Sequence, residues 1–193
     1  ATRLYEGLVD SQLRSDDIQG ALRYAEAAEN STETLGEFGA SESIKAAFLT
    51  ARIQRTAQNL PGLREAIGRA MRVSDASGDR LLQARSALQA GRFSIEADPD
   101  LSLSILEKGL IRAREADALA IEAAICGHIA SIQIRRAFVS EAKKYSEAEM
   151  EAIGRAGIVQ GTLRNKLRLA RCFDLLGQLK QCADMLESET PPD

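Results

Sequence analysis

Three kinds of side chain in this chain of 193 residues could take part in chemistry: a single histidine, three cysteines and many arginines. His128 has no carboxylate or nucleophile beside it as a catalytic set would require, and the chain contains no G-x-S-x-G, Walker or G-x-G-x-x-G motif. The cysteines, Cys126, Cys172 and Cys182, form no C-x-x-C pair and do not cluster with the further ligands that a zinc site needs. The sequence therefore predicts a non-enzymatic protein that has neither a metal nor a cofactor.

The number and placement of the cysteines indicate a reducing compartment. Three is an odd number, whereas a disulfide framework needs pairs of cysteines. Each cysteine has small or apolar neighbours on a predicted helix face, so we expect all three to be buried as small hydrophobic residues. We accordingly predict that the protein is cytoplasmic.

Two charged segments have structural rather than chemical interpretations. Asp98-Pro99-Asp100 contains two carboxylates, as a metal site does, but it is better explained as a turn between helices with a cap before Leu101. The segment 141–151 is rich in Glu and Lys, and we interpret it as a charged outer helix whose partners lie four residues apart.

The composition favours helices. Aromatic residues make up 4% of the chain, tryptophan is absent, and alanine occurs 31 times, which argues against a β-sandwich or a β-barrel. The formal net charge of −3 does not indicate a nucleic-acid-binding protein. Because no apolar run approaches the roughly 18–20 residues needed to cross a bilayer, we predict no contact with a membrane.

A local pattern recurs along the chain at a nearly constant interval. An apolar residue, two polar residues, a small residue and further apolar positions follow one another at helical spacing. The small residues, which we call anchors, are Ala21, Ala66, Ser104, Ala142 and Cys182, and their successive separations in sequence number are 45, 38, 38 and 40. An interval of this size is typical of stacked supersecondary units, in which a small residue lets two helices cross closely.

The breaks between these patterns predict ten helices. They form five antiparallel pairs at about 1–30, 41–77, 79–116, 118–156 and 158–188, followed by a tail over 189–193. Pro61-Gly62 separates the helices of the second pair, whereas the break near Arg136-Ala137 in the fourth pair has neither glycine nor proline. The chain starts inside a helical pattern without Met, so we expect it to be a segment of a longer protein.

At these positions the chain resembles the tetratricopeptide repeat family. The residues that carry the resemblance are Leu169-Ala170, Phe173, Gly177, Leu179 and Cys182 in the fifth pair, and Tyr5, Leu8, Ile18, Ala21, Ala25 and Ala28 in the first. The repeat interval is longer than the basic interval of the family and is similar to the variant in large bacterial regulators, such as maltose-activator-type LuxR regulators and ATPase- or cyclase-linked regulators. The resemblance implies a single all-α domain over 1–188, a right-handed superhelical α-solenoid. A HEAT-type or other α-solenoid stays open as an alternative.

The resemblance also implies that the first helix of each pair lines a concave surface. The first helices of pairs two to five carry an excess of basic residues and the second helices an excess of acidic residues, which predicts a basic inner face and an acidic outer face. We align Gly91, Gly127 and Ala170 with the small residue that the family has in the first helix of each pair. The residues that this alignment places on or near the concave face are Arg52, Arg55, Arg85, Arg92, His128, Arg164, Arg168 and Arg171.

Two interpretations of this arginine set stay open. The guanidinium groups could bind carboxylates of an acidic peptide or of an acidic partner helix, because arginine presents a planar fork that suits carboxylates. Alternatively, they form a solvated face with partners inside the chain, since arginine is the default basic residue of this sequence. The set does not match the family's carboxylate clamp, which uses lysine and asparagine.

The leading functional hypothesis is therefore a non-catalytic protein-binding module of a cytoplasmic signalling or transcription regulator. A second hypothesis is a role linked to nucleic acid or nucleotides, which the acidic outer face and the lack of aromatic stacking residues oppose. A third is an oligomerisation scaffold, in which Leu4, Leu8 and Leu13 of the first helix would be covered by a further copy or domain.

Overall fold

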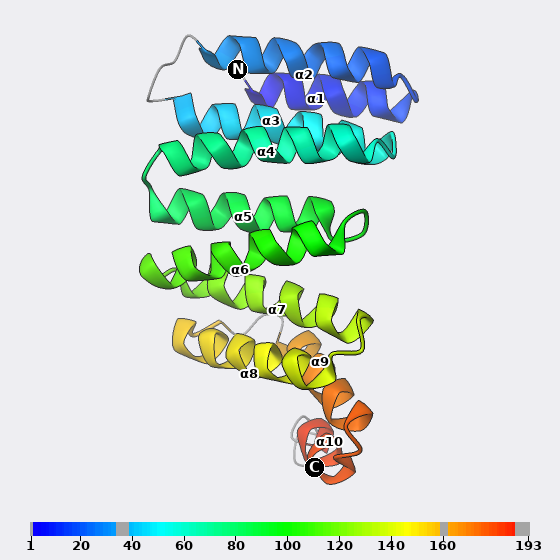
Figure 1. Ribbon diagram of the computed structural model, residues 1–193, viewed down its shortest axis with the longest axis vertical. Helices are drawn as coiled ribbons and strands as arrows, with labels where there is room; N and C mark the ends of the chain where they lie inside the picture. The colour runs from blue at the N-terminus through cyan, green and yellow to red at the C-terminus, as the bar shows by residue number, and fades with distance from the viewer. Residues whose placement is uncertain (1, 34–38, 159–161, 188–193) are drawn as a thin grey trace, which may run out of the picture. The chain divides into compact units, whose positions relative to one another are not determined.

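The computed structural model of the chain describes residues 2–33, 39–158 and 162–187. All regular secondary structure in these ranges is α-helical, and no strand occurs in them. The helices are α1 (Thr2–Arg14), α2 (Ile18–Glu33), α3 (Ala40–Thr56), α4 (Leu60–Ala76), α5 (Arg80–Ser94), α6 (Pro99–Glu115), α7 (Leu119–Arg135), α8 (Val139–Ala156), α9 (Thr162–Leu175) and α10 (Leu179–Glu187). Figure 1 shows them as sequential antiparallel pairs, which confirms the predicted all-α fold.

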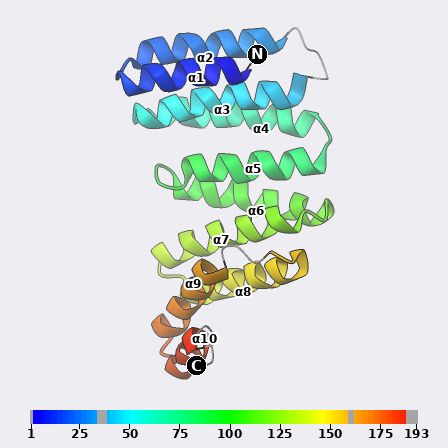
Figure 2. The same ribbon diagram turned by 180° about the vertical axis from the view of Figure 1, so that it is seen from behind.

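The chain divides into two compact units, Ala1–Ile105 and Leu106–Asp193, which we call unit 1 and unit 2. In unit 1, α1 packs on α2, α3 packs on both α2 and α4, and α4 packs on α5. In unit 2, α8 packs on both α7 and α9, and α9 packs on α10. The first helices of neighbouring pairs also contact each other, α1 with α3 and α3 with α5 in unit 1, and α7 with α9 in unit 2. This order of contacts within each unit is consistent with an α-solenoid, and Figure 2 shows the helices from behind.

The turns inside the pairs give the repeat a common register. Each turn ends at a residue whose backbone N–H bonds back to the preceding helix, and these residues are Asp17, Asn59, Asp98, Phe138 and Gln178. Their successive separations in sequence number are 42, 39, 40 and 40. The turns therefore recur at a nearly constant interval, as the sequence predicts.

Two of the five predicted anchors are wrong in register. Ala21, Ala142 and Cys182 lie four residues after the turn residue and donate their N–H to its carbonyl oxygen, but Leu63 and Ser102 hold this position in the second and third pairs. Ser104 is exposed, whereas Ser102 is fully buried and donates its hydroxyl to the carbonyl oxygen of Gly91 at 2.9 Å.

The error in the second pair comes from Pro61-Gly62, which lies in the first turn of α4 and not in the break before it. Proline is tolerated there because the first backbone N–H groups of a helix have no partner inside the helix. The helix starts after Asn59, whose side-chain oxygen accepts the N–H of Gly62 at 3.2 Å.

Left-handed residues close most of the turns. Glycine takes this conformation at Gly78, Gly157 and Gly177, but Asp16, Gln58, Asp117 and Ala137 take it with a side chain. Ala137 (φ 61°) ends the helix pattern near Arg136-Ala137, where the sequence predicts a break without glycine or proline. A left-handed residue lets the next N–H reach back to the preceding helix, which is why a turn forms here.

We expect Ala137→Gly to raise the free energy of unfolding by about 0.5–1 kcal/mol. A left-handed alanine is strained by about 1–2 kcal/mol, and part of this gain is offset by the greater freedom of glycine in the unfolded chain. Urea denaturation followed by circular dichroism measures the change. Gly177→Ala is the matched reverse variant, because an added Cβ there meets nothing within 4 Å, and it should destabilise by a similar amount. A loss of stability in Ala137→Gly would contradict the turn geometry.

Candidate functional site

The structure distributes the predicted site residues over four helices. Arg52 and Arg55 lie on α3 and Arg85 and Arg92 on α5, all in unit 1. His128 lies on α7, and the remaining three residues, Arg164, Arg168 and Arg171, lie on α9 in unit 2. Each unit therefore has a separate group of these residues.

In unit 1, two of the four predicted arginines have partners inside the chain. Arg52 pairs with Asp10 of α1 (Nη2–Oδ1 2.8 Å), and the guanidinium of Arg55 lies 5.1 Å from the ring centroid of Phe93. Arg52 lines a hollow of ≈ 590 Å³ that also contains two carboxylates, those of Glu6 and Glu42. Arg85 and Arg92 are exposed on α5. Arg52 and Arg55 therefore fit the interpretation of arginines with partners inside the chain.

Unit 2 contains a different kind of hollow, between α7 and α9. It has a volume of ≈ 670 Å³, and its lining consists of Ser131, Ile134 and Arg135 from α7 and Arg164, Leu167, Arg168 and Arg171 from α9. We call it the arginine hollow. Among the residues that the structure describes, no acidic residue lines it. Ser131 and Arg135 lie four positions apart on α7, and Arg164, Arg168 and Arg171 lie four and three positions apart on α9. Residues at such spacings share one face of a helix.

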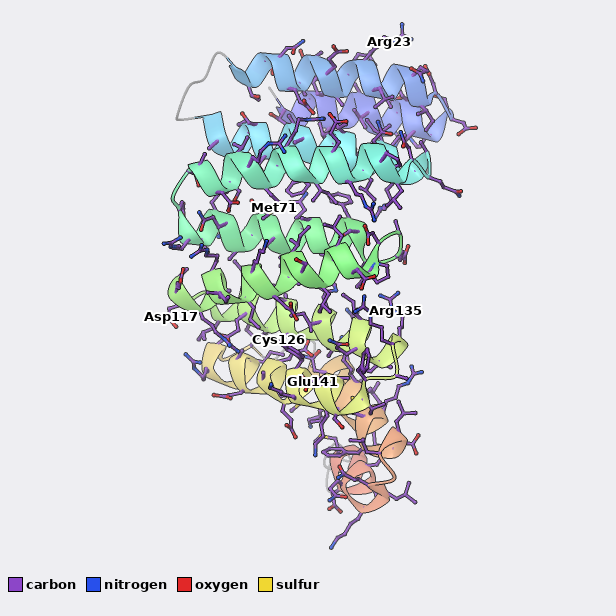
Figure 3. The ribbon with its side chains drawn as sticks, viewed as in Figure 1. Arg23, Met71, Asp117, Cys126, Arg135 and Glu141 are labelled. Carbon is purple, nitrogen blue, oxygen red and sulfur yellow. The ribbon has the colours of Figure 1, made fainter. Side chains whose placement is uncertain are left out.

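Figure 3 labels Arg135 at the end of α7 and Cys126 further back along the same helix, and Arg135 is one of the residues that line this hollow. On α9, Arg164, Arg168 and Arg171 follow one another along one face. No carboxylate in the described part of the chain pairs with Arg164 or Arg171. Arg168, by contrast, has a partner in the core.

That partner is Glu149 of α8, whose carboxylate forms an ion pair with the guanidinium of Arg168. Only 7% of the Glu149 side chain and 15% of the Arg168 side chain are exposed. Gly127 of α7 makes room for both groups, because a Cβ there would lie 2.3 Å from Oε1 of Glu149 and 2.8 Å from Nη1 of Arg168. Three helices thus meet at one buried ion pair, and this pair holds Arg168 at the edge of the hollow.

Burial raises the pKa of the Glu149 carboxyl above its ordinary value, and the charges of Arg168 and Arg164 lower it in part. The folded chain therefore holds a proton on Glu149 more tightly than the unfolded chain does. The contribution of this group to the free energy of unfolding falls as the pH rises from the ordinary value of 4.5 through the raised pKa. Desolvation of the carboxylate is the physical cause.

No protein-family model and no curated protein matches the chain. None of the helices in the described ranges is long and apolar enough to cross a membrane. The same ranges contain no group of three or more His, Cys, Asp or Glu residues that could hold a metal ion.

Counted from the turn residues, the position predicted for His128 is held by another residue. The buried residue eight positions before the turn residue is Ala130 in the fourth pair and Ala170 in the fifth. Ser131, and not His128, therefore matches Arg171, and it lines the arginine hollow where it donates its hydroxyl to the carbonyl oxygen of Gly127 at 2.9 Å. His128 is half-buried one helical turn earlier. The error arises because Gly127 resembles the small packing residue of the family, whereas it makes room for the Glu149–Arg168 pair. By the same count the buried residues of the second and third pairs are Ala51 and Ala90, which are followed by Arg52 and Gly91 and not by Arg55 and Arg92.

Two of the three cysteines are as buried as the sequence predicts. Cys126 and Cys172 have no exposed surface, whereas Cys182 is half-buried. Burial raises the pKa of the Cys126 thiol to about 12, and it also raises the pKa of the Cys172 thiol. Since the thiolate is the reactive form, both thiols are inert at neutral pH.

We expect one thiol of the native chain to react with a disulfide reagent within minutes at pH 8, and all three to react in denaturant. Cys182 supplies the reactive thiol because it alone has exposed surface. Absorbance of the released chromophore counts the thiols, and Cys182→Ser is the control that abolishes the native reaction. A second fast thiol in the native Cys182→Ser variant would show that Cys126 or Cys172 is accessible.

Proposed function

We propose that the chain is a non-catalytic repeat module of the tetratricopeptide type that binds an acidic segment of a partner protein. In this proposal it serves within a signalling or transcription regulator. The sequential helix pairs and the nearly constant interval between their turns support the module type. The arginine hollow supports the binding of an acidic segment.

The observation that carries the proposal is the unbalanced charge of the arginine hollow. Four guanidinium groups line it without an acidic lining residue, and neither Arg164 nor Arg171 pairs with a carboxylate in the described part of the chain. A solvated face with internal partners accounts for Arg52 and Arg168 but not for these two residues. Carboxylates of a partner would supply the missing charge through bidentate contacts.

The arrangement of α9 also favours this site over the hollow in unit 1. α9 carries four basic residues and one acidic residue, and three of the basic residues lie in the hollow. The unit 1 hollow contains Lys45 and Arg52, which pair with Glu42 and Asp10 respectively. A ligand at unit 1 would therefore compete with carboxylates that are already bound.

The test compares proteins captured from a lysate of the source organism by three baits. These are the native chain, the variant Arg164→Glu/Arg171→Glu and the charge-matched control Lys144→Glu/Lys180→Glu on α8 and α10. We expect a set of proteins with acidic segments that the native and control baits retain, also after nuclease treatment, and that the α9 variant loses. Circular dichroism must show equal helicity for all baits. Identical capture by the three baits would overturn the proposal.

A further inference from the structure

The charge available in the arginine hollow is larger than one carboxylate can neutralise. Glu149 neutralises Arg168 from the core side, while Arg164 and Arg171 contribute two guanidinium groups without a carboxylate partner among the described residues. A phosphoryl group on a side chain carries a charge of about −1.5 to −2 at pH 7 and offers three acceptor oxygens. Its charge therefore matches these two arginines, whereas a single Asp or Glu leaves one of them without a partner.

The spacing along α9 allows several guanidinium groups to reach one anion. Arg164, Arg168 and Arg171 lie four and three residues apart, which corresponds to about 6 and 4.5 Å along the helix axis. Arg168, the middle residue, is fixed by Glu149 and by the space that Gly127 leaves. A guanidinium that is already positioned loses little conformational freedom when it donates to a ligand.

The other residues that line the hollow indicate what would surround a bound anion. Arg135 of α7 lines the hollow, and the hydroxyl hydrogen of Ser131 is already donated to the carbonyl oxygen of Gly127. Two apolar side chains, Ile134 and Leu167, also line the hollow, and Leu167 is 51% exposed. An apolar residue beside the anionic group of the ligand would cover this surface.

The size of the hollow favours a peptide segment over a free phosphate ion. Its volume of ≈ 670 Å³ lies within the range of about 300–1,000 Å³ for pockets that bind compact organic ligands. A phosphate ion alone would leave most of this space and the two apolar side chains uncovered. A phosphorylated side chain together with its flanking residues would fill the space and cover the two apolar side chains.

We propose that the arginine hollow is a phosphoryl-binding site that takes a phosphorylated serine or threonine, flanked by apolar residues, in a segment of a partner protein. This inference rests on the proposed function, since it specifies the acidic group that the module recognises. Arg164 and Arg171 contact the phosphoryl oxygens, and Glu149 and Gly127 act as positioning residues for Arg168.

The test uses three degenerate peptide pools that differ only in their central residue, which is phosphoserine, glutamate or serine. The full chain binds each labelled pool in solution, and fluorescence anisotropy reports the affinity. We expect the phosphoserine pool to bind at least about tenfold more tightly than the glutamate pool, because charge-assisted bonds to arginine are made to a dianion. Apolar residues should be enriched beside the phosphoserine in the retained peptides.

Matched variants locate the binding. Arg164→Gln/Arg171→Gln should weaken binding of the phosphoserine pool at least about tenfold. Arg23→Gln/Arg72→Gln, which removes two exposed arginines of α2 and α4 outside the predicted set, should change it less than about twofold. Lowering the pH from 7.5 to 5 should weaken binding of the phosphoserine pool, since the second phosphoryl pKa is about 6. The same pH change should not weaken binding of the glutamate pool, because its carboxylate stays ionised and protonation of Glu149 only adds positive charge to the hollow.

The outcomes separate this inference from the proposed function. If the phosphoserine and glutamate pools bind equally and both depend on Arg164 and Arg171, the phosphoryl preference is overturned and binding of an acidic segment stands. If no pool binds in a way that depends on these two arginines, both proposals fail at this hollow. Equal loss in the Arg23→Gln/Arg72→Gln variant would show binding by overall charge alone and would also overturn the site.

Discussion

Glu149→Ala is expected to lower the free energy of unfolding of unit 2 by about 3–5 kcal/mol. The change removes one partner of a buried ion pair and leaves the guanidinium of Arg168, only 15% exposed on its side chain, without a carboxylate. A buried charge without a partner costs more than the pair itself contributes. Since a whole domain is stable by about 5–15 kcal/mol, this is a large fraction of its stability. Urea denaturation and amide hydrogen exchange of α7–α9 measure the loss.

Two further variants test the cause. Glu147→Ala removes an exposed carboxylate of the same helix, 3.8 Å from Lys143, and should cost less than about 0.5 kcal/mol. Glu149→Leu/Arg168→Met replaces both charges with apolar groups of similar length and should restore stability to within about 1 kcal/mol of the native chain. If the double variant is as unstable as Glu149→Ala, packing and not an unpaired charge explains the loss.

The helices could be predicted closely from the sequence because their ends carry local signals. The predicted fourth pair, 118–156, ends at the residue where α8 ends, and Gly157 (φ 65°) provides the left-handed cap that glycine favours. The errors lie where a local signal has two meanings. Pro61-Gly62 fits a turn as well as the first turn of a helix, and only the hydrogen bonds around Asn59 distinguish the two. The register of the anchor in the second pair depends on that distinction.

The candidate site could be predicted only in part, because it depends on contacts between helices. The sequence predicts Arg164, Arg168 and Arg171 on one surface, and they line one hollow. It also predicts a charged outer helix with partners four residues apart, which describes Glu147 and Lys143 but not Glu149. No spacing within α8 indicates a partner on α9. Gly127 is the one available signal, since a glycine inside a helix often marks a close approach.

The second large effect is expected in unit 1, at Phe48. The ring belongs to the core cluster formed with Ile44, Leu63 and Ile67 and is 2% exposed, yet it also lines the unit 1 hollow. We expect Phe48→Ala to lower the free energy of unfolding by about 3–5 kcal/mol, because a fully buried ring is removed and its neighbours can fill the space only in part. The chain has no tryptophan, so circular dichroism follows the urea transition.

Variants of graded size separate a core ring from a ring that merely borders the hollow. Phe48→Leu should cost less than about 1.5 kcal/mol because it keeps most of the apolar volume, and Leu4→Ala, at a side chain that is 70% exposed, should cost less than about 0.5 kcal/mol. The ring centroids of Phe93 and Phe48 lie 5.6 Å apart, and the guanidinium of Arg55 lies on the face of Phe93. Loss of the Phe48 ring therefore also removes the contact between the two rings. A cost of Phe48→Ala below about 1 kcal/mol would mean that the ring packs against solvent in the hollow. Such a result would contradict the burial of the Phe48 side chain, which is only 2% exposed.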